Sequence, residues 1–350
     1  MLQAAYAPYR LALRFEARTS RAIMHHKDTY FIKIWDDSEP EIAGIGECAL
    51  FRGLSADDVP DYESRLSQVC RNIVNITDLE DIGLSSIIFG VETAMADLLS
   101  GGKRIIRQNR WSNGDMRLQI NGLVWMADRD TMLKRIQEKL SDGFKCLKLK
   151  IGGIAFHEEL ELLRSIRENF SPDELEIRLD ANGAFLPSEA TGKLDALSEY
   201  CIHSIEQPIK AGQIKEMSDI CRKSPIPVAL DEELIGCRDY DAQARLLDAI
   251  SPQFIIIKPS LCGGLSASSR WISLARQKGI GWWATSAMES NIGLNAIAQW
   301  VANFNPKMPQ GLGTGQIYEN NITSPIRLDS QWLSYDSNGN WEIPELEWLR

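Results

Sequence analysis

The chain has 350 residues, a length that predicts one large or two ordinary domains. Its 44% hydrophobic and 25% charged residues are close to the averages of soluble globular proteins, which excludes the disordered, collagen-like and disulfide-scaffold classes. The 48 acidic and 38 basic residues leave a net charge of −10. Because the sequence has no local basic stripe to offset this charge, no nucleic-acid partner is expected.

The seven cysteines are odd in number, widely spaced and never arranged as Cys-x-x-Cys, so we expect reduced thiols and neither a disulfide framework nor a zinc site. The first 21 residues lack a basic and apolar leader with a cleavage site, and no apolar run approaches the ~20 residues that span a bilayer. We therefore expect a cytoplasmic protein without a membrane partner. Its oligomeric state is not indicated by the sequence.

The first third of the chain mixes short strand patterns with amphipathic helical stretches, which predicts an α+β domain over residues 1–112. A glycine pair follows the second helical stretch and is typical of a helix C-terminus. Residues 321–350 fall outside the pattern that comes before them and are predicted to return to this domain. The strand patterns lie at 11–15 and 30–35, and the helical stretches at 57–74 and 84–100.

From residue 113 to 320 short β-rich runs alternate regularly with amphipathic helical stretches. Eight such units over roughly 200 residues predict a closed (β/α)₈ barrel. A doubly wound parallel sheet is the alternative, but the Gly-rich phosphate turn expected after its first strand is missing. The runs are 118–124, 146–151, 176–181, 203–208, 227–232, 254–259, 281–286 and 309–314.

Charged residues stand near the ends of five successive runs, where a buried strand should be apolar. A lone charge at a strand end is most often a helix cap or a solvated loop residue. Five at intervals of 25 to 30 residues match the length of one strand–helix unit, so we expect them to meet at the C-terminal face of the barrel, where barrel enzymes hold their active sites. They are Lys150, Asp180, Glu206, Asp231 and Lys258.

Asp180, Glu206 and Asp231 offer three carboxylates from adjacent strands, and such oxygen ligands favour Mg²⁺. Zinc is disfavoured because none of the four histidines has ligand spacing. Asn182, two residues after Asp180, can orient a ligand or a water molecule beside the metal. Since the three carboxylates repel one another, we expect that the substitution Asp231→Asn weakens metal binding and leaves the fold largely intact.

Lys148 and Lys150 are two residues apart on a strand, so both side chains face the barrel interior. Two neighbouring ammonium groups beside a divalent cation disfavour protonation. We therefore expect a lowered lysine pKa, as a general base requires.

This ordered set resembles the enolase superfamily, in its muconate-lactonising subgroup. The resemblance lies in the Lys-x-Lys of residues 148–150, the Asp-x-Asn of 180–182, Glu206, Asp231 and Lys258. It implies an enolase-like barrel whose N-terminal α+β domain, completed by the C-terminal tail, caps the active site. It also implies a small carboxylate substrate, bound Mg²⁺ and a lysine base that forms an ene-diolate, the chemistry for which this superfamily is the standard example.

Within the subgroup, residues 120–125, 285–300 and 311–315 are similar to the o-succinylbenzoate synthases. That resemblance implies dehydration of 2-succinyl-6-hydroxy-2,4-cyclohexadiene-1-carboxylate to 2-succinylbenzoate, a step of menaquinone biosynthesis. Lys150 would remove the proton, Lys258 would stabilise the intermediate, and Lys148 would tune Lys150. Substrate contacts are expected from Ser286, Ala287 and Met288, and from Thr19, Ser20 and Arg21 in a loop of the cap.

Two alternatives remain open. The first is an isomerase on the same scaffold, either an N-acylamino acid racemase with Lys150 and Lys258 as opposed bases or a dipeptide epimerase. An epimerase usually carries Asp-x-Asp after the last barrel strand, and residues 311–317 lack it. The second is a catalytically silent barrel that binds a metal or a partner, against which the intact lysines and carboxylates argue.

Overall fold

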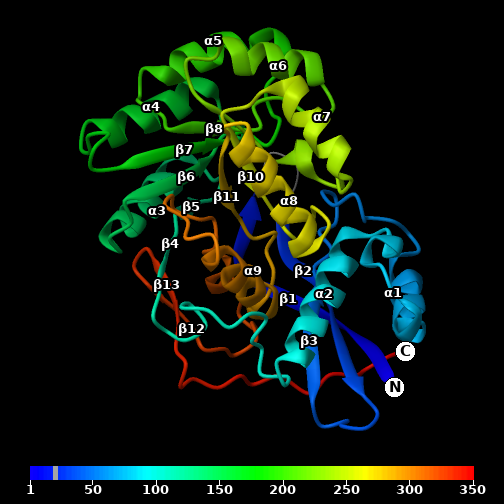
Figure 1. Ribbon diagram of the computed structural model, residues 1–350. Helices are drawn as coiled ribbons and strands as arrows, with labels where there is room; N and C mark the ends of the chain where they lie inside the picture. The colour runs from blue at the N-terminus through cyan, green and yellow to red at the C-terminus, as the bar shows by residue number, and fades with distance from the viewer. Residues whose placement is uncertain (19–22) are drawn as a thin grey trace.

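The computed structural model describes residues 1–18 and 23–350 (Figure 1). Its N-terminal part is an antiparallel sheet in the order β1–β2–β3 with two helices against it. The long strands exceed the short runs that we predicted, and β3 was not predicted. The elements are β1 (Leu2–Arg18), β2 (Ile23–Asp36), β3 (Ala43–Cys48), α1 (Tyr62–Arg71), η1 (Ile73–Asn75), η2 (Leu79–Ile82) and α2 (Ser85–Leu99).

Helix α2 lies directly on β3 because the strand carries glycines where it faces the helix. A Cβ atom at Gly44 would stand 1.9 Å from the carbonyl oxygen of Ala94, and one at Gly46 would stand 2.0 Å from that of Gly90. No side chain fits at that distance. The glycines therefore allow the close packing that holds the sheet of the cap against its central helix.

The predicted barrel is confirmed as a parallel sheet in which the strands follow one another in chain order from β5 to β11. A helix on the outside connects each strand to the next (Figure 1). The strands are β5 (Gly122–Val124), β6 (Cys146–Lys150), β7 (Glu176–Asp180), β8 (Ser204–Glu206), β9 (Val228–Leu230), β10 (Phe254–Ile257) and β11 (Gly281–Ala284). The helices are α3 (Arg129–Ser141), α4 (Phe156–Arg167), α5 (Pro187–Ser198), α6 (Ile214–Lys223), α7 (Tyr240–Ile250), α8 (Gly264–Gln277) and α9 (Asn291–Ala302), with η3 (Glu232–Leu234) and η4 (Thr314–Gln316).

The eighth unit closes the barrel by single bridges instead of a full strand. Gln310 pairs in parallel with Ile120, and Gly311 pairs in parallel with Thr285. The Gly311 amide donates to the Ala284 carbonyl at 2.8 Å, so the segment is hydrogen-bonded on both sides. A barrel of eight segments results, although the run 309–314 is much shorter as a strand than we predicted.

Our prediction of one continuous strand over 118–124 is wrong. The run divides into β4 (Leu118–Gln119), which pairs with β13, and β5, which pairs with β6. β13 (Trp332–Tyr335) also pairs with β12 (Ile326–Asp329), which makes a third small sheet. Side-chain alternation does not reveal which partner a strand takes, and so the division is invisible in the sequence.

The C-terminal tail returns to the cap at several points, since Ile322 shares a buried cluster with Phe31 and Ile45, and Trp341, Ile343, Leu346 and Trp348 pack against that cluster. Its first part is the β12–β13 hairpin beside the barrel, and its end runs along β1, where Tyr6 and Leu349 exchange two backbone hydrogen bonds of 2.9 and 2.7 Å. The two chain ends consequently lie close together (Figure 1). In the described residues no helix has the length and apolarity needed to span a membrane.

Arg178 and Trp283 form a buried layer inside the barrel, below the charged residues of the site. The Arg178 guanidinium lies 4.3 Å from the centre of the Trp283 ring, and its Nε donates to Glu176 at 2.7 Å. Arg178 and Trp283 are each 1% exposed. Because Arg178 precedes Asp180 by two residues on β7, this layer supports the site from beneath.

Candidate active site

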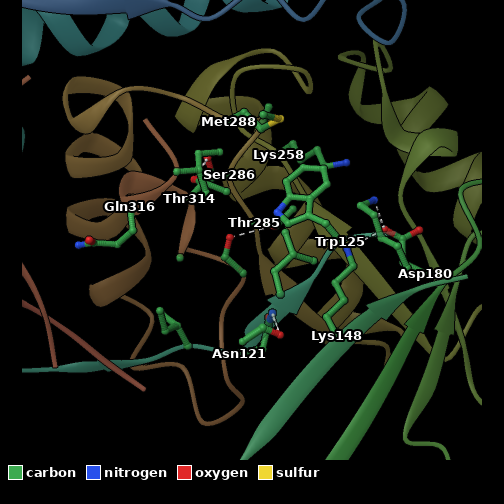
Figure 2. A pocket seen from close by; sticks show the side chains of 18 of the residues that line it. Asn121, Trp125, Lys148, Asp180, Lys258, Thr285, Ser286, Met288, Thr314 and Gln316 are labelled. Atoms are coloured by element: carbon green, nitrogen blue, oxygen red, sulfur yellow. Dashed lines mark hydrogen bonds and ion pairs between the residues drawn. The ribbon is translucent and has the colours of Figure 1, made fainter. Parts of the chain in front are cut away.

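A cavity of about 250 Å³ lies at the C-terminal ends of the barrel strands. Lys148, Asp180 and Lys258 reach it from the barrel (Figure 2). Lys150 lines it as well. Strand ends of a parallel barrel all point to one face, which is why residues far apart in the chain meet here. Four other predicted site residues also line the cavity: Asn182, Ser286, Ala287 and Met288.

Lys148 stands between two of the predicted metal ligands. Its Nζ lies 3.0 Å from Asp180 Oδ2 and 2.5 Å from Glu206 Oε2. These residues come from the adjacent strands β6, β7 and β8, and Asp180 and Glu206 are paired across the β7–β8 ladder. All three are buried, with exposures of 9%, 0% and 2%. Buried charges of this kind are tolerable only when they neutralise one another.

Lys150 is held by two acceptors. Its Nζ donates to Asp180 Oδ2 at 2.8 Å and to Asn182 Oδ1 at 2.7 Å. Asn182 has a left-handed backbone with φ of 46°, its amide donates to Asp180 Oδ1 at 3.0 Å, and its Nδ2 donates to Glu232 Oε1 at 3.1 Å. In the structure the Asn182 side chain thus accepts a hydrogen bond from Lys150. From the sequence we expected it to orient a ligand or a water molecule beside the metal.

Lys258 forms a buried ion pair with Asp231. The Asp231 amide donates to Gln207 Oε1 at 3.2 Å, which fixes the carboxylate above β8 and β9. Lys150 ends β6 and Lys258 follows β10, so the two lysines lie four strands apart in a barrel of eight segments. Half of the circumference separates them, and they face the cavity from opposite walls.

The carboxylates dominate the electrostatics of this site. Burial lowers the pKa of Lys148, but attraction from Asp180, Glu206 and Asp231 outweighs it and raises that pKa well above its usual value. The pKa of Lys258 is raised in the same way, mainly by Asp231 against the effect of burial. The chain's own charges therefore do not lower the pKa of Lys148, contrary to our expectation for the lysine pair.

The pKa values of the Glu206 and Asp180 carboxyls are shifted in opposite directions. Burial and the neighbouring Asp180 raise the pKa of Glu206 well above its usual value. Burial acts in the same direction on Asp180, but Lys148 and Lys150 outweigh it and lower the pKa of that carboxyl. The carboxylate nearest two ammonium groups stays charged most readily.

The three carboxylates have the chemistry that a hard divalent cation requires. Glu206 Oε1 and Asp231 Oδ1 are buried and have no hydrogen-bond partner among residues 1–18 and 23–350, which leaves two oxygens for a ligand. As placed, no three His, Cys, Asp or Glu side chains of residues 1–18 and 23–350 converge at metal-binding distances. Lys148 contacts two of the carboxylates and Lys258 contacts the third, so the lysines occupy the space between them.

The ion pair with Lys258 also argues against our expectation for Asp231→Asn. Mutual repulsion of three carboxylates is not the dominant interaction, because each of the three contacts an ammonium group. Removal of the Asp231 charge would leave Lys258 buried without this partner, which costs stability.

The loop after β11 forms another wall of the cavity. Tyr318 OH donates to the Met288 carbonyl at 2.6 Å and holds a residue whose φ is 63°. The Ser286 hydroxyl donates to Glu289 Oε2 and accepts from Thr314, so its single proton is directed away from a substrate. Contact through the backbone of residues 286–288 remains compatible with our expectation. The predicted contacts Thr19, Ser20 and Arg21 lie outside the described residues.

Sequence reasoning missed the apolar side of the cavity. The Trp125 ring centre lies 5.7 Å from Lys150 Nζ, and Trp125 directly follows β5, so the strand-end rule could have identified it. Phe15, Phe51 and Leu54 reach the cavity from the N-terminal part of the chain, and no periodicity in the sequence indicates which cap residues do so. Further polar lining residues are Asn121, Thr285, Thr314 and Gln316 (Figure 2).

Comparisons with known proteins agree with this geometry. The family described as "Enolase C-terminal domain-like" matches residues 131–331. The chain is 42% identical to an o-succinylbenzoate synthase of Desulfotalea psychrophila, over 95% of this chain and 98% of that protein. It is 25% identical to an o-succinylbenzoate synthase of Bacillus subtilis, over 70% of this chain and 64% of that protein.

Solved structures give the same result. The crystal structure of MenC from Desulfotalea psychrophila matches with a TM-score of 0.80 and 40% identity, over 95% of this chain and 99% of that one. A dipeptide epimerase from Enterococcus faecalis, complexed with Mg and a dipeptide, matches with a TM-score of 0.83 but only 20% identity, over 95% and 96% of the two chains, and so it supports the fold alone. The chain belongs to the enolase superfamily and, within it, to the o-succinylbenzoate synthase family.

Proposed function

We propose that this protein is a lyase that dehydrates 2-succinyl-6-hydroxy-2,4-cyclohexadiene-1-carboxylate to 2-succinylbenzoate in menaquinone biosynthesis. The observation that carries the proposal is the placement of Lys150 and Lys258 on opposite walls of a cavity, each paired with a buried carboxylate. The match to an o-succinylbenzoate synthase over nearly the whole of both chains supports this substrate. Trp125 and Met288 offer apolar surface to a six-membered ring.

Lys150 acts as the base in this proposal. Its amine takes the proton from the ring carbon that bears the carboxylate, and the C–H bonding pair ends as a new C=C bond of the aromatic ring. The neighbouring C–O bond breaks, and the hydroxyl leaves as water with the proton that Lys150 took. Proton removal and proton delivery thus occur on one face, which makes the reaction a syn elimination. Asp180 and Asn182 hold the Lys150 amine in place.

Lys258 works on the opposite face. It stays protonated beside Asp231, and its charge stabilises the negative charge that develops on the substrate when the proton leaves. A contact between its ammonium and the face of the ring adds to this effect. Lys148 keeps Asp180 and Glu206 together and tunes Lys150 through the carboxylate that both lysines share.

Asp180, Glu206 and Asp231 are the residues we propose to hold Mg²⁺. The unpartnered oxygens of Glu206 and Asp231 and the all-carboxylate donor set support this assignment. When bound there, a divalent cation would supply positive charge beside the substrate carboxylate. Lys148 contacts Glu206 Oε2 and Lys258 contacts Asp231 Oδ2, so the other oxygen of each carboxylate would be offered to the metal.

A racemase that acts on N-acylamino acids is a second candidate, because opposed lysines are also what a two-base proton transfer requires. Incubation of the purified protein with Mg²⁺ and each substrate in turn separates the two. Formation of 2-succinylbenzoate, abolished by a chelator and restored by Mg²⁺, is the expected result. Racemisation without dehydration, or full dehydration in the metal-stripped sample with chelator present, would refute the proposal.

The seven free thiols, five of them buried, support a cytoplasmic location.

A further inference from the structure

Glu289 is a buried carboxylate beside the cavity that the proposed reaction does not use. It follows Met288 and is 0% exposed. Its two oxygens are bound to two different loops, since Oε1 accepts from the Ser260 hydroxyl and Oε2 accepts from the Ser286 hydroxyl. Burying a carboxylate costs free energy, which an apolar residue at this position would avoid. The side chain is therefore placed for its two acceptor oxygens.

The loops that Glu289 connects are those that form the Lys258 wall. Ser260 follows Lys258 by two residues, in the turn between β10 and α8. Ser286 follows β11, and its hydroxyl also accepts a 2.7 Å hydrogen bond from Thr314 Oγ1, in the segment that follows the closing bridges. Figure 2 shows Ser286 and Thr314 side by side above Thr285. One carboxylate thus links the last three strand ends of the barrel.

A cation from the cap lies within electrostatic reach of this carboxylate. Lys27 of β2 is 6% exposed, and within the described residues its Nζ has no hydrogen-bond partner. Its charge interacts with Glu47 and Glu289. Glu47 is already satisfied by four donors, namely Thr29 Oγ1, the Ser290 amide and hydroxyl, and the Gly293 amide at the start of α9. Burial lowers the pKa of Lys27, and the charges of Glu47, Glu289 and Asp28 act against that shift, so Glu289 is one of three carboxylates that attract Lys27.

We propose that Glu289 is a positioning residue that holds Lys258 against the cavity by fixing Ser260 to Ser286. The inference rests on the proposed function, because that function assigns Lys258 its role at the substrate. Glu289 itself does not touch the reacting atoms. Its effect reaches them through the turn of residues 258–260, where a displacement of about 1 Å is enough to lower a rate about 100-fold.

The test is a double-mutant cycle between Glu289→Gln and Ser260→Ala, with kcat for dehydration as the readout. Each single variant is expected to lower kcat by about 10- to 100-fold with a much smaller change in KM. Ser260→Ala should add little to Glu289→Gln, since both break the same link. The matched control is Glu47→Gln, which also removes a buried carboxylate near Lys27 but whose hydrogen bonds go to Thr29, Ser290 and Gly293 instead of the Lys258 turn. It should lose thermal stability and keep kcat.

Additive losses in the cycle, or an equal loss of kcat in Glu47→Gln, would overturn the inference in favour of a general structural role. If Glu289→Gln does not fold, Ser260→Ala alone carries the comparison with Glu47→Gln.

A second readout does not depend on the reaction. Acetic anhydride labelling of Lys258, measured by mass spectrometry relative to the exposed Lys215, reports the position of Lys258 even if the wild type proves inactive with this substrate. Changed Lys258 labelling in Glu289→Gln or Ser260→Ala, but not in Glu47→Gln, supports the inference. Unchanged labelling in both variants contradicts it, whereas loss of wild-type turnover alone contradicts only the proposed function.

Discussion

The Lys150 ammonium donates to the side-chain oxygen of Asn182 over 2.7 Å, and Asn182 holds that oxygen in place through a backbone with φ of 46°. Asparagine adopts this left-handed conformation more readily than most residues. The backbone of Asn182 thus shapes the turn after β7, while its side chain orients Lys150. A substitution can remove one effect and keep the other.

Replacement of Asn182 tests this separation. Asn182→Gly keeps the turn and removes the acceptor, so we expect near wild-type stability and a kcat lowered about tenfold because Lys150 is less well oriented. Asn182→Ala should show the same kinetic loss together with about 1 kcal/mol of destabilisation from the left-handed backbone. Urea unfolding and steady-state kinetics measure the two effects. Wild-type kcat in Asn182→Gly would show that the hydrogen bond has no role in orienting the base.

The Asp231–Lys258 pair predicts a stability effect opposite to the one that carboxylate repulsion suggested. Asp231→Asn leaves the Lys258 ammonium buried without its partner, which we expect to lower the free energy of unfolding by about 3–5 kcal/mol in the absence of metal. The double variant Asp231→Asn/Lys258→Met should recover most of that loss because no unpaired charge remains. Denaturant titrations of the three metal-stripped proteins decide the matter. Equal stability of Asp231→Asn and the wild type would restore the repulsion picture.

Alkaline pH should weaken the contact between β1 and α1, where the Tyr6 hydroxyl donates to Glu63. Burial, and then Glu63, whose Oε1 accepts from the hydroxyl at 3.2 Å, raise the pKa of Tyr6 to about 12 from its ordinary value of 10.0. The unfolded chain therefore loses this proton first as the pH rises above 10, and Tyr6 disfavours the folded state between pH 10 and 12. The contribution at pH 11 is about 1.4 kcal/mol, from one pKa unit.

The matched variant for this effect is Tyr6→Phe. Its free energy of unfolding should fall less steeply than that of the wild type between pH 9 and 11, by roughly 1 kcal/mol. Tyr30 also donates to Glu63, so Tyr30→Phe is measured alongside to separate its contribution from that of Tyr6. Parallel stability curves over this range would contradict the assignment.

The role of Lys258 separates dehydration from racemisation. Arginine keeps a cation that can stack on the ring, so Lys258→Arg should retain measurable dehydration, whereas Lys258→Ala should lose about 3–4 kcal/mol of transition-state stabilisation. A racemase needs a base on each face, and arginine stays protonated, so Lys258→Arg should abolish any racemisation of an N-acylamino acid. Both reactions are measured on each variant. Equal and complete loss of dehydration in Lys258→Arg and Lys258→Ala would contradict a purely electrostatic role.

The sequence alone was sufficient for the barrel and for the charged residues of the site. Lys150, Asp180 and Glu206 end successive strands that pair with one another, and a constant interval along the chain reflects that arrangement directly. The same rule covers Trp125, which directly follows β5, although we did not apply it. Residues that recur at the end of each strand–helix unit can therefore be predicted from the sequence alone.

Contacts between distant segments of the chain could not be predicted from the sequence. Which cap residues reach the cavity, as Phe15 and Phe51 do, depends on how two domains pack, and no local pattern records it. The direction of the Ser286 proton depends on Glu289 and Thr314, and the raised pKa of Lys148 depends on carboxylates from other strands. The division of residues 118–124 between two sheets depends on the C-terminal hairpin. Each of these features arises from tertiary packing.

The most direct test of the account is a comparison of wild type with Lys150→Ala in excess Mg²⁺, with two quantities measured in D₂O: 2-succinylbenzoate formed, and deuterium incorporated at the substrate carbon that bears the carboxylate. Because the proposed mechanism gives both proton transfers to Lys150, Lys150→Ala should lose product formation and deuterium exchange together, while the wild type forms product. Exchange that persists in Lys150→Ala would assign proton removal to another group and contradict the central claim.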